Sequence, residues 1–253
     1  MLYRYKMKLE YDGTKFIGWQ KQPSSHGISV QQKLEDTLLA VLSKNISLFV
    51  AGRTDSGVHA INQVAHFDTD ILLKLKKICT TLNYFLKNTG IIVLSIENVD
   101  LSFDARLSAK QRIYCYNILN RDAPTALFYG RVWHIFNLEL NVSAMMEAAT
   151  ILVGTHDFTA FRSPRCQAKS PIRTIDYINI SESNFPLEKT ISIEFGAKSF
   201  LHNQVRLLVG GLFCVGAGKW DITKLLTVLE SKSRKECHVM APPHGLYLKK
   251  ILY

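Results

Sequence analysis

The spacing of hydrophobic residues in the first hundred positions constrains the fold more than any other feature of the sequence. Large apolar and charged residues alternate over residues 5–11, which is typical of a strand with one buried face. Over residues 30–42 the apolar residues recur every three or four positions behind Ser29, a favourable helix N-cap, so a helix is predicted there. A short strand, a longer strand, a helix and a strand are predicted next, at residues 46–50, 63–68, 70–87 and 91–99. This order predicts an α+β fold.

The rest of the chain continues to alternate between strand and helix patterns. Strands are predicted at residues 110–119, 131–136, 173–181 and 190–195, and helices at residues 143–153, 200–211 and 221–230. A closing turn and strand follow at residues 241–248. We therefore expect two α/β halves, residues 1–102 and 103–253, with mainly antiparallel sheets and helices on the outer face.

Composition and charge narrow the class of protein. The 253 residues are 47% hydrophobic, enough to bury a sizeable core. Thirty-one Lys and Arg against 21 Asp and Glu give a formal charge of +10, which favours a polyanionic partner without separating RNA from DNA or a membrane. The N-terminus lacks the apolar core of a signal peptide, and the apolar stretch 207–218 is too short and too glycine-rich to span a bilayer. With five scattered cysteines, a reducing compartment is expected, so we predict a cytoplasmic protein.

A polar segment at residues 51–60 is the first candidate for chemistry. It lies between two predicted strands and is bounded by Gly52 and Gly57, so the chain can turn sharply there and present Asp55 at a sheet edge. A single carboxylate beside Arg53 suits a nucleophile or an ion pair better than paired acid and base catalysis. The alternative is that Asp55 only caps backbone amides in a turn.

Two further segments combine aromatic and polar residues. Phe16 and Trp19 lie in a polar stretch after the first strand, where they would either stack on unpaired bases or fill the core. Residues 156–173 are predicted to form a long loop that is either solvated surface or an RNA contact. Its aromatic and basic members are Phe158, Phe161, Arg162, Arg165, Lys169 and Arg173.

Tyr114 and Arg206 each stand in a pattern that leaves two interpretations open. Tyr114 and Tyr116 share one face of a predicted strand, as core aromatics or as residues that meet a partner. Arg206 interrupts an apolar helical pattern, so its guanidinium either reaches solvent or meets a buried carboxylate.

Several motifs, in order along the chain, resemble those of the tRNA pseudouridine synthase A family. Residues 52–59, Gly-Arg-Thr-Asp-Ser-Gly-Val-His, resemble its catalytic signature, and residues 11–22 its opening motif Tyr-Asp-Gly-Thr-x-Phe-x-Gly-Trp-Gln-x-Gln. Further along, Arg-x-Tyr-x-Tyr at 112–116, His-x-x-Val-Arg-x-x-Val-Gly at 202–210 and the turn and strand at 241–248 are similar to family blocks. The resemblance covers nearly the whole chain. Asp104 stands where some relatives have histidine, so its role is open.

The resemblance implies a function and a fold. It implies isomerisation of uridine to pseudouridine at positions 38, 39 and 40 of the tRNA anticodon stem-loop, by base flipping, in a homodimer. It also implies the pseudouridine synthase fold, in which the two halves meet at a central catalytic cleft.

Site residues are implied as well. Asp55 would be the nucleophile, attacking either C6 of the base or C1′ of the sugar, with Tyr114 stacked on the base and able to assist proton transfer, and Arg206 paired to Asp55. Substrate contacts are expected at Arg53, Thr54, His59, Arg112 and Arg173.

No cofactor is expected. The rearrangement changes neither composition nor oxidation state, so it requires no redox group. Neither a Cys-x-x-Cys nor a His-x-x-x-His grouping is present to suggest a metal, and no Gly-x-x-x-x-Gly-Lys-Ser/Thr suggests a nucleotide. The competing hypothesis is an RNA-binding protein without catalysis, which the presence of both Asp55 and Arg206 disfavours.

Overall fold

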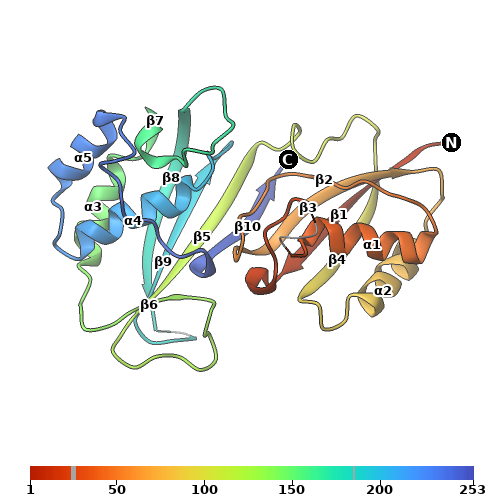
Figure 1. Ribbon diagram of the computed structural model, residues 1–253, viewed down its shortest axis with the longest axis horizontal. Coiled ribbons are helices and arrows are strands. Elements are labelled where there is room, and N and C mark those ends of the chain that lie inside the picture. The colour runs from red at the N-terminus through yellow and green to blue at the C-terminus, as the bar shows by residue number, and fades with distance from the viewer. Residues whose placement is uncertain (24–26, 185) are drawn as a thin grey trace. The chain divides into compact units, whose positions relative to one another are not determined.

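The computed structural model describes residues 1–23, 27–184 and 186–253, and its chain divides into two compact units (Figure 1). The first comprises Met1–Arg112 and Tyr247–Tyr253, and the second comprises Ile113–Leu246. This division differs from the expected one because residues 103–112 and the C-terminal strand pack with the first unit. Strand β10 (Leu246–Leu252) pairs in parallel with β3 (His59–Thr69), and the amide of Lys110 donates to the carbonyl of Leu252.

The first unit is built on β1 (Tyr3–Tyr11), which lies between β3 and β4 (Ile91–Val99) and is antiparallel to both. The short β2 (Phe49–Val50) also pairs with β3. Alternate residues of β1 point into the core, as the sequence pattern predicts. These buried residues are Tyr5, Met7, Leu9 and Tyr11.

Helices α1 (Val30–Leu42) and α2 (Leu75–Phe85) belong to the described part of the first unit. Helix α1 has the predicted bounds, and the hydroxyl of Ser29 accepts the amide of Gln32 at 3.1 Å, which confirms the predicted cap. Helix α2 is shorter than predicted because Lys74 is extended and Asn88 takes a positive φ, which turns the chain towards β4. Helix α2 packs on β4.

The second unit contains most of β5 (Gln111–Asn120) in the strand order β5-β9-β8-β7. Strand β8 (Ile172–Ser183) is antiparallel to both β9 (Thr190–Ala197) and β7 (Gly154–Asp157), whereas β6 (Trp133–Ile135) is parallel to β5. The prediction of one long loop over 156–173 is therefore wrong in part. Its start belongs to β7, and a 3-10 helix, η3 (Thr159–Phe161), follows.

Helices α3 (Val142–Thr150), α4 (Gln204–Gly216) and α5 (Ile222–Ser231) pack together in the second unit (Figure 1). Helix α4 begins later and ends later than predicted. Asn203 takes a φ of 63° before its first turn, and the two glycines thought to end it lie inside it. A Cβ on Gly210 would lie 2.2 Å from the carbonyl oxygen of Val239, so the glycine allows close packing.

The predicted α+β class with mainly antiparallel pairing is confirmed by these elements. The structure also describes the 3-10 helices η1 (Gly13–Lys15), which follows β1, and η4 (Pro243–Gly245), which precedes β10. Within the described ranges, none of the helices has the length and apolar character needed to cross a membrane.

Candidate active site

The loop that carries Asp55 connects β2 to β3. The amide of Val58 donates to the carbonyl of Asp55 at 3.1 Å and closes the turn. Of the two bounding glycines, Gly57 takes a positive φ of 77°, and Gly52 does not. The prediction that glycine is needed for a sharp turn therefore holds at Gly57 and not at Gly52. Asp55 is half-buried, and its neighbour Arg53 is exposed. The loop therefore leaves its carboxylate and one cation within reach of a partner molecule.

Three buried polar side chains, those of Thr54 in the loop and of Tyr11 and Gln63 in the neighbouring strands, are joined by hydrogen bonds. The hydroxyls of Thr54 and Tyr11 are 2.7 Å apart, and the side-chain amide of Gln63 donates to the oxygen of Tyr11 at 3.2 Å and to the carbonyl of Gly52 at 2.8 Å. Tyr11 and Gln63 were not among the predicted site residues. A usable signal was present, because the period of two places Gln63 on the same strand face as Ala65 and Phe67, where a polar residue is out of place.

The segment after β1 supports the loop from another side. The amide of Trp19 donates to the carbonyl of Thr54 at 3.0 Å, and the hydroxyl of Ser56 donates to the carbonyl of Phe16. Gly18, with a φ of 106°, approaches so closely that a Cβ there would lie 2.8 Å from the Thr54 carbonyl oxygen. Phe16 and Trp19 are buried, so they fill the core and are not free to stack on bases.

Arg112 is buried and ties the start of the loop to a distant segment. Its guanidinium donates to the carbonyl of Ala51 through Nε at 3.2 Å and Nη2 at 2.8 Å, and Nη2 also donates to the carbonyl of Arg106 at 2.6 Å. Nearby, the carboxylate of Asp104 accepts the amides of Arg106 and Leu107, which makes Asp104 a turn former. The predicted contact of Arg112 with substrate stays a prediction.

His59 lies at the start of β3 and is also buried. Its Nδ1 accepts the amide of Gly13 at 3.0 Å, and a carboxylate oxygen of Asp12 lies 3.2 Å from the same nitrogen. The Nδ1 atom of His59 therefore lies within contact distance of both the Gly13 amide and the Asp12 carboxylate. The imidazole stacks on Tyr247 with 4.8 Å between ring centroids. His59 therefore holds η1 and β10 against the end of the loop.

The two tyrosines of β5 differ in environment. Tyr116 is fully buried, and its hydroxyl donates to the carbonyl of Pro242 at 2.8 Å. A Cβ on Gly245 would lie 2.6 Å from its ring, so the closing turn packs directly on it. Tyr114 is half-buried and meets Phe200 edge-on, with 5.3 Å between centroids. Tyr116 is a core residue, and Tyr114 keeps part of its ring accessible.

Arg206 lies in the first turn of α4 and is half-buried. Its Nε donates to the carbonyl of Ala241 at 2.8 Å, the amide of Ala241 donates back to the carbonyl of Arg206 at 3.1 Å, and Nη1 donates to the side chain of Asn203 at 3.3 Å. The guanidinium is thus fixed to the closing turn. Burial, followed by the charge of Arg206, lowers the pKa of His244 in the same turn. The predicted pairing of Arg206 with Asp55 stays a prediction.

The basic and aromatic segment at 156–173 separates into two sets. Phe158 and Phe161 are fully buried, whereas Arg165 and Lys169 are exposed. Arg173, on β8, donates through Nη1 to the carbonyls of Ser170 and Ile172, and its buried Nε has no hydrogen-bond partner. The rings belong to the core, and only the cations are available for contact with RNA.

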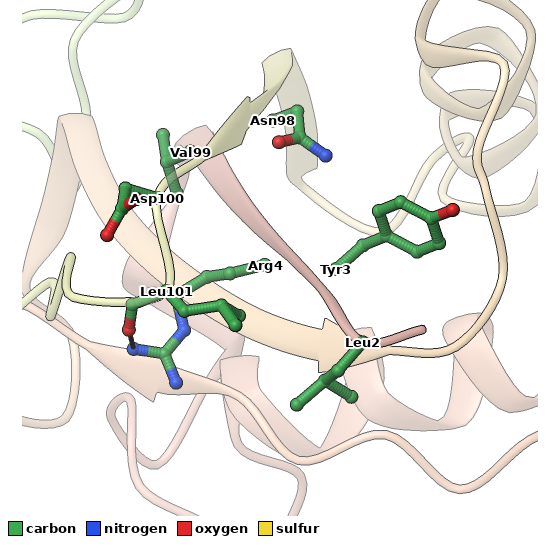
Figure 2. Close-up of a pocket in the computed structure, with 7 residues that line it drawn as sticks. All are labelled: Leu2, Tyr3, Arg4, Asn98, Val99, Asp100 and Leu101. Carbon is green, nitrogen blue, oxygen red and sulfur yellow. Dashed lines mark hydrogen bonds between the residues drawn. The ribbon is translucent and has the colours of Figure 1, made fainter.

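A surface groove in the first unit lies apart from the Asp55 loop. Figure 2 shows its lining, in which Arg4 bonds to the carbonyl of Leu101. Arg4 also pairs with Asp68, with both nitrogen to oxygen distances at 2.7 Å, and donates to the carbonyl of Phe103. The groove contains none of the predicted site residues, and its arginine is committed to the fold.

Comparison with known proteins identifies the family. A family model described as tRNA pseudouridine synthase matches residues 8–107 and 148–253. The chain is 47% identical over 250 residues to tRNA pseudouridine synthase A of Wolbachia pipientis wMel, covering 99% of this chain and 100% of that one. It is 45% identical over 252 residues to the protein of that name from Anaplasma marginale (strain Florida), with the same coverage, and 45% identical over 250 residues to that of Afipia carboxidovorans, covering 99% of each.

A solved structure, a Cbf5-Nop10-Gar1 complex, matches with a TM-score of 0.34 and 14% identity over 83% of this chain and 45% of that one, too weakly to support an argument.

The fold and the sequence matches define the class of protein as an RNA-modifying isomerase. More particularly, the chain belongs to the tRNA pseudouridine synthase family.

Proposed function

We propose that the protein isomerises uridine to pseudouridine at positions 38, 39 and 40 of the tRNA anticodon stem-loop. The observation that carries this proposal is the match, over 99% of the chain, to relatives named tRNA pseudouridine synthase A. The formal charge of +10 is consistent with a tRNA substrate. We further propose that the enzyme works in the cytoplasm as a homodimer.

The reaction breaks the bond between ribose C1′ and N1 of uracil, turns the base and rejoins it to the ribose through C5. The proton on C5 is lost, and N1 gains one, so the product is an isomer of the substrate. Uridine in a stem must first be flipped out of its stack, at a cost of a few kcal/mol. Asp55 is the proposed nucleophile, acting on C6 or on C1′. Its half-buried position on a loop fixed from beneath supports this role.

Tyr114 is proposed to stack on the flipped uracil and to assist removal of the C5 proton. Its partly accessible ring supports this role, in contrast to the buried ring of Tyr116. Arg206 is proposed to pair with Asp55 and hold its carboxylate in the orientation needed for reaction. Its hydrogen bond to the Ala241 carbonyl would fix the direction of the guanidinium.

The further substrate contacts are proposed in two groups. Arg53 is exposed and Arg173 is half-buried, so both can bind phosphate. Thr54, His59 and Arg112 are buried and bonded to neighbouring protein groups, so their proposed contribution to substrate binding is to maintain the shape of the loop.

A tritium-release assay tests the proposal. Transfer RNA labelled with tritium at C5 of uridine is incubated with the wild-type protein and with Asp55→Ala, and both are assayed for tRNA binding. We expect release to water with the wild type only, and similar binding by both. Release by both proteins would refute Asp55 as the nucleophile. Binding without release by the wild type would refute the isomerase and support the RNA-binding alternative.

A further inference from the structure

We propose that Tyr11, Thr54 and Gln63 form a positioning network that fixes the backbone beside Asp55 in the geometry needed for reaction. The inference rests on the proposed function, because it assigns three residues of the first unit to the same reaction. None of the three needs to touch the substrate to act in this way.

The network joins three parts of the sequence at one end of a strand pair. Tyr11 is the last residue of β1, Gln63 lies within β3, and Thr54 immediately precedes Asp55. The pairing of β1 with β3 is irregular at this end, since Leu9 faces Gln63 but Tyr11 faces Ala60. Such irregularities re-aim side chains and are frequent beside active sites. Here the shift lies at Tyr11, whose hydroxyl bonds to Thr54 of the loop.

Three hydrogen bonds join the members of the network to one another and to the loop. The amide group of Gln63 gives one proton to the carbonyl of Gly52 and one to the oxygen of Tyr11. Burial raises the pKa of Tyr11 to about 12, so its phenol keeps a proton that can bond the Thr54 hydroxyl at 2.7 Å. Tyr11, Thr54 and Gln63 are 3%, 6% and 0% exposed, so water does not replace a partner that is lost.

The consequence for Asp55 follows from where the network holds the chain. It binds the loop at Gly52 and at Thr54, on either side of the exposed Arg53. Thr54 is held a second time through its carbonyl, which accepts the amide of Trp19 at 3.0 Å. The residue next to Asp55 is therefore fixed by both its side chain and its backbone. A displacement of about 1 Å at a reacting group costs on the order of 10²-fold in rate, so this fixation has catalytic value.

Matched tyrosine variants test the inference. Tyr11→Phe removes the central hydroxyl of the network. Tyr5→Phe, on the same strand, removes the hydroxyl of an equally buried tyrosine that bonds the amide of Leu73 at 2.9 Å and the carbonyl of Ile71 at 3.3 Å, away from the loop. Single-turnover tritium release, tRNA affinity and Tm are measured for both, together with Gln63→Met, which keeps the side-chain volume and removes the amide.

The expected result separates rate from stability. Tyr11→Phe and Gln63→Met should lower the single-turnover rate by about tenfold or more. Affinity for tRNA should stay within about twofold, because the side chains of the network are buried. Tyr5→Phe should lower Tm by about as much as Tyr11→Phe does, because each variant leaves a buried hydrogen-bond partner unpaired. The rate of Tyr5→Phe should nevertheless equal that of the wild type.

Other outcomes overturn the inference. A wild-type rate in folded Tyr11→Phe would show that the network serves stability alone. If Tyr5→Phe lost as much rate as Tyr11→Phe, the loss would not be specific to the network, and the network would again serve stability alone. Gln63→Met provides a second route to the same decision if one variant does not fold. Failure of the wild type to release tritium would count against the proposed function itself, and is thereby distinguished from failure of the network.

Discussion

The Asp55 loop of the first unit and the closing turn of the second unit, residues 241–245, each hold a candidate catalytic residue, but by opposite means. At the loop, the buried neutral side chains of Tyr11 and Gln63 bond to Thr54 and to the Gly52 carbonyl, the residues on either side of Arg53. At the closing turn the candidate itself makes the bonds, because the guanidinium of Arg206 donates directly to the Ala241 carbonyl.

This difference teaches how function and stability are divided. A reactive group whose loop is held by neighbouring residues can be replaced without removing the hydrogen bonds of those neighbours. A cation that is part of its support cannot, because its loss leaves a carbonyl without its donor. The following predictions use that contrast, from the largest effect on activity to the smallest.

The largest effect on activity should come from Asp55→Asn. Loss of the carboxylate should reduce tritium release by roughly 10³-fold or more, because the proposed nucleophile is gone. The free energy of unfolding should fall by less than it does in Arg206→Ala, because the hydrogen bonds from Tyr11, Gln63 and Trp19 to the loop remain. Single-turnover release and urea denaturation measure the two quantities. A large loss of stability would break the contrast drawn between the two regions.

Gly18→Ala should affect the loop through its backbone. The new Cβ would lie 2.8 Å from the Thr54 carbonyl oxygen, so the loop must shift, and we expect the rate to fall by about 10²-fold. Gly218→Ala is the control, because Gly218 also has a positive φ, 67°, but no atom within 4 Å of its Cβ position. Both variants should lose about 1 kcal/mol of stability through backbone strain. A normal rate in Gly18→Ala would show that the loop tolerates displacement.

Arg206→Ala should reduce catalysis and stability together. We expect weaker tritium release with little change in tRNA affinity, and a loss of about 1–3 kcal/mol in the free energy of unfolding, since the Ala241 carbonyl loses its donor. Equilibrium binding, single-turnover release and denaturation distinguish the three quantities. A defect confined to affinity would contradict the proposed pairing with Asp55, and unchanged stability would contradict the structural role of Arg206.

Asp68 lies outside both regions, so Asp68→Asn should leave activity unchanged. The hydrogen bond from Arg4 lowers the pKa of Asp68, so the pair stabilises the fold above the ordinary pKa of 3.8 and loses this contribution as pH falls through the lowered value. At pH 7 the variant should be about 1 kcal/mol less stable, a modest figure because the pair is partly exposed. Urea denaturation at neutral and acidic pH should show that the difference in free energy of unfolding between the wild type and Asp68→Asn becomes smaller in acid. A difference that does not change with pH would refute the stabilising role of the ionised Asp68.

Local patterns predicted much of the fold. Ser29 and the apolar spacing behind it predicted α1 to the residue, and the strand predicted at 91–99 is β4. The bounds of α4 were less accessible, because Gly210 resembles a helix terminator until the backbone of Val239 is seen against it. The return of β10 to β3 was also beyond local reasoning, since nothing in residues 247–253 specifies a partner almost two hundred residues earlier.

The residues of the candidate site also differ in whether the local sequence could predict them. Asp55, Tyr114 and Arg206 could be chosen from residue type and motif, because chemistry requires particular side chains in a recognisable context. Tyr11 and Gln63 could not, because their importance lies in the hydrogen bonds that they make across the sheet.

By itself, the sequence determined the fold class, most of the elements, the family and the residues suited to the chemistry, since these depend on periodicity and on side-chain type. Only the tertiary structure decided which polar groups are buried together and which backbones approach within contact distance. The physical reason is that a buried hydrogen bond joins residues far apart in the chain, and no local pattern records such a partner.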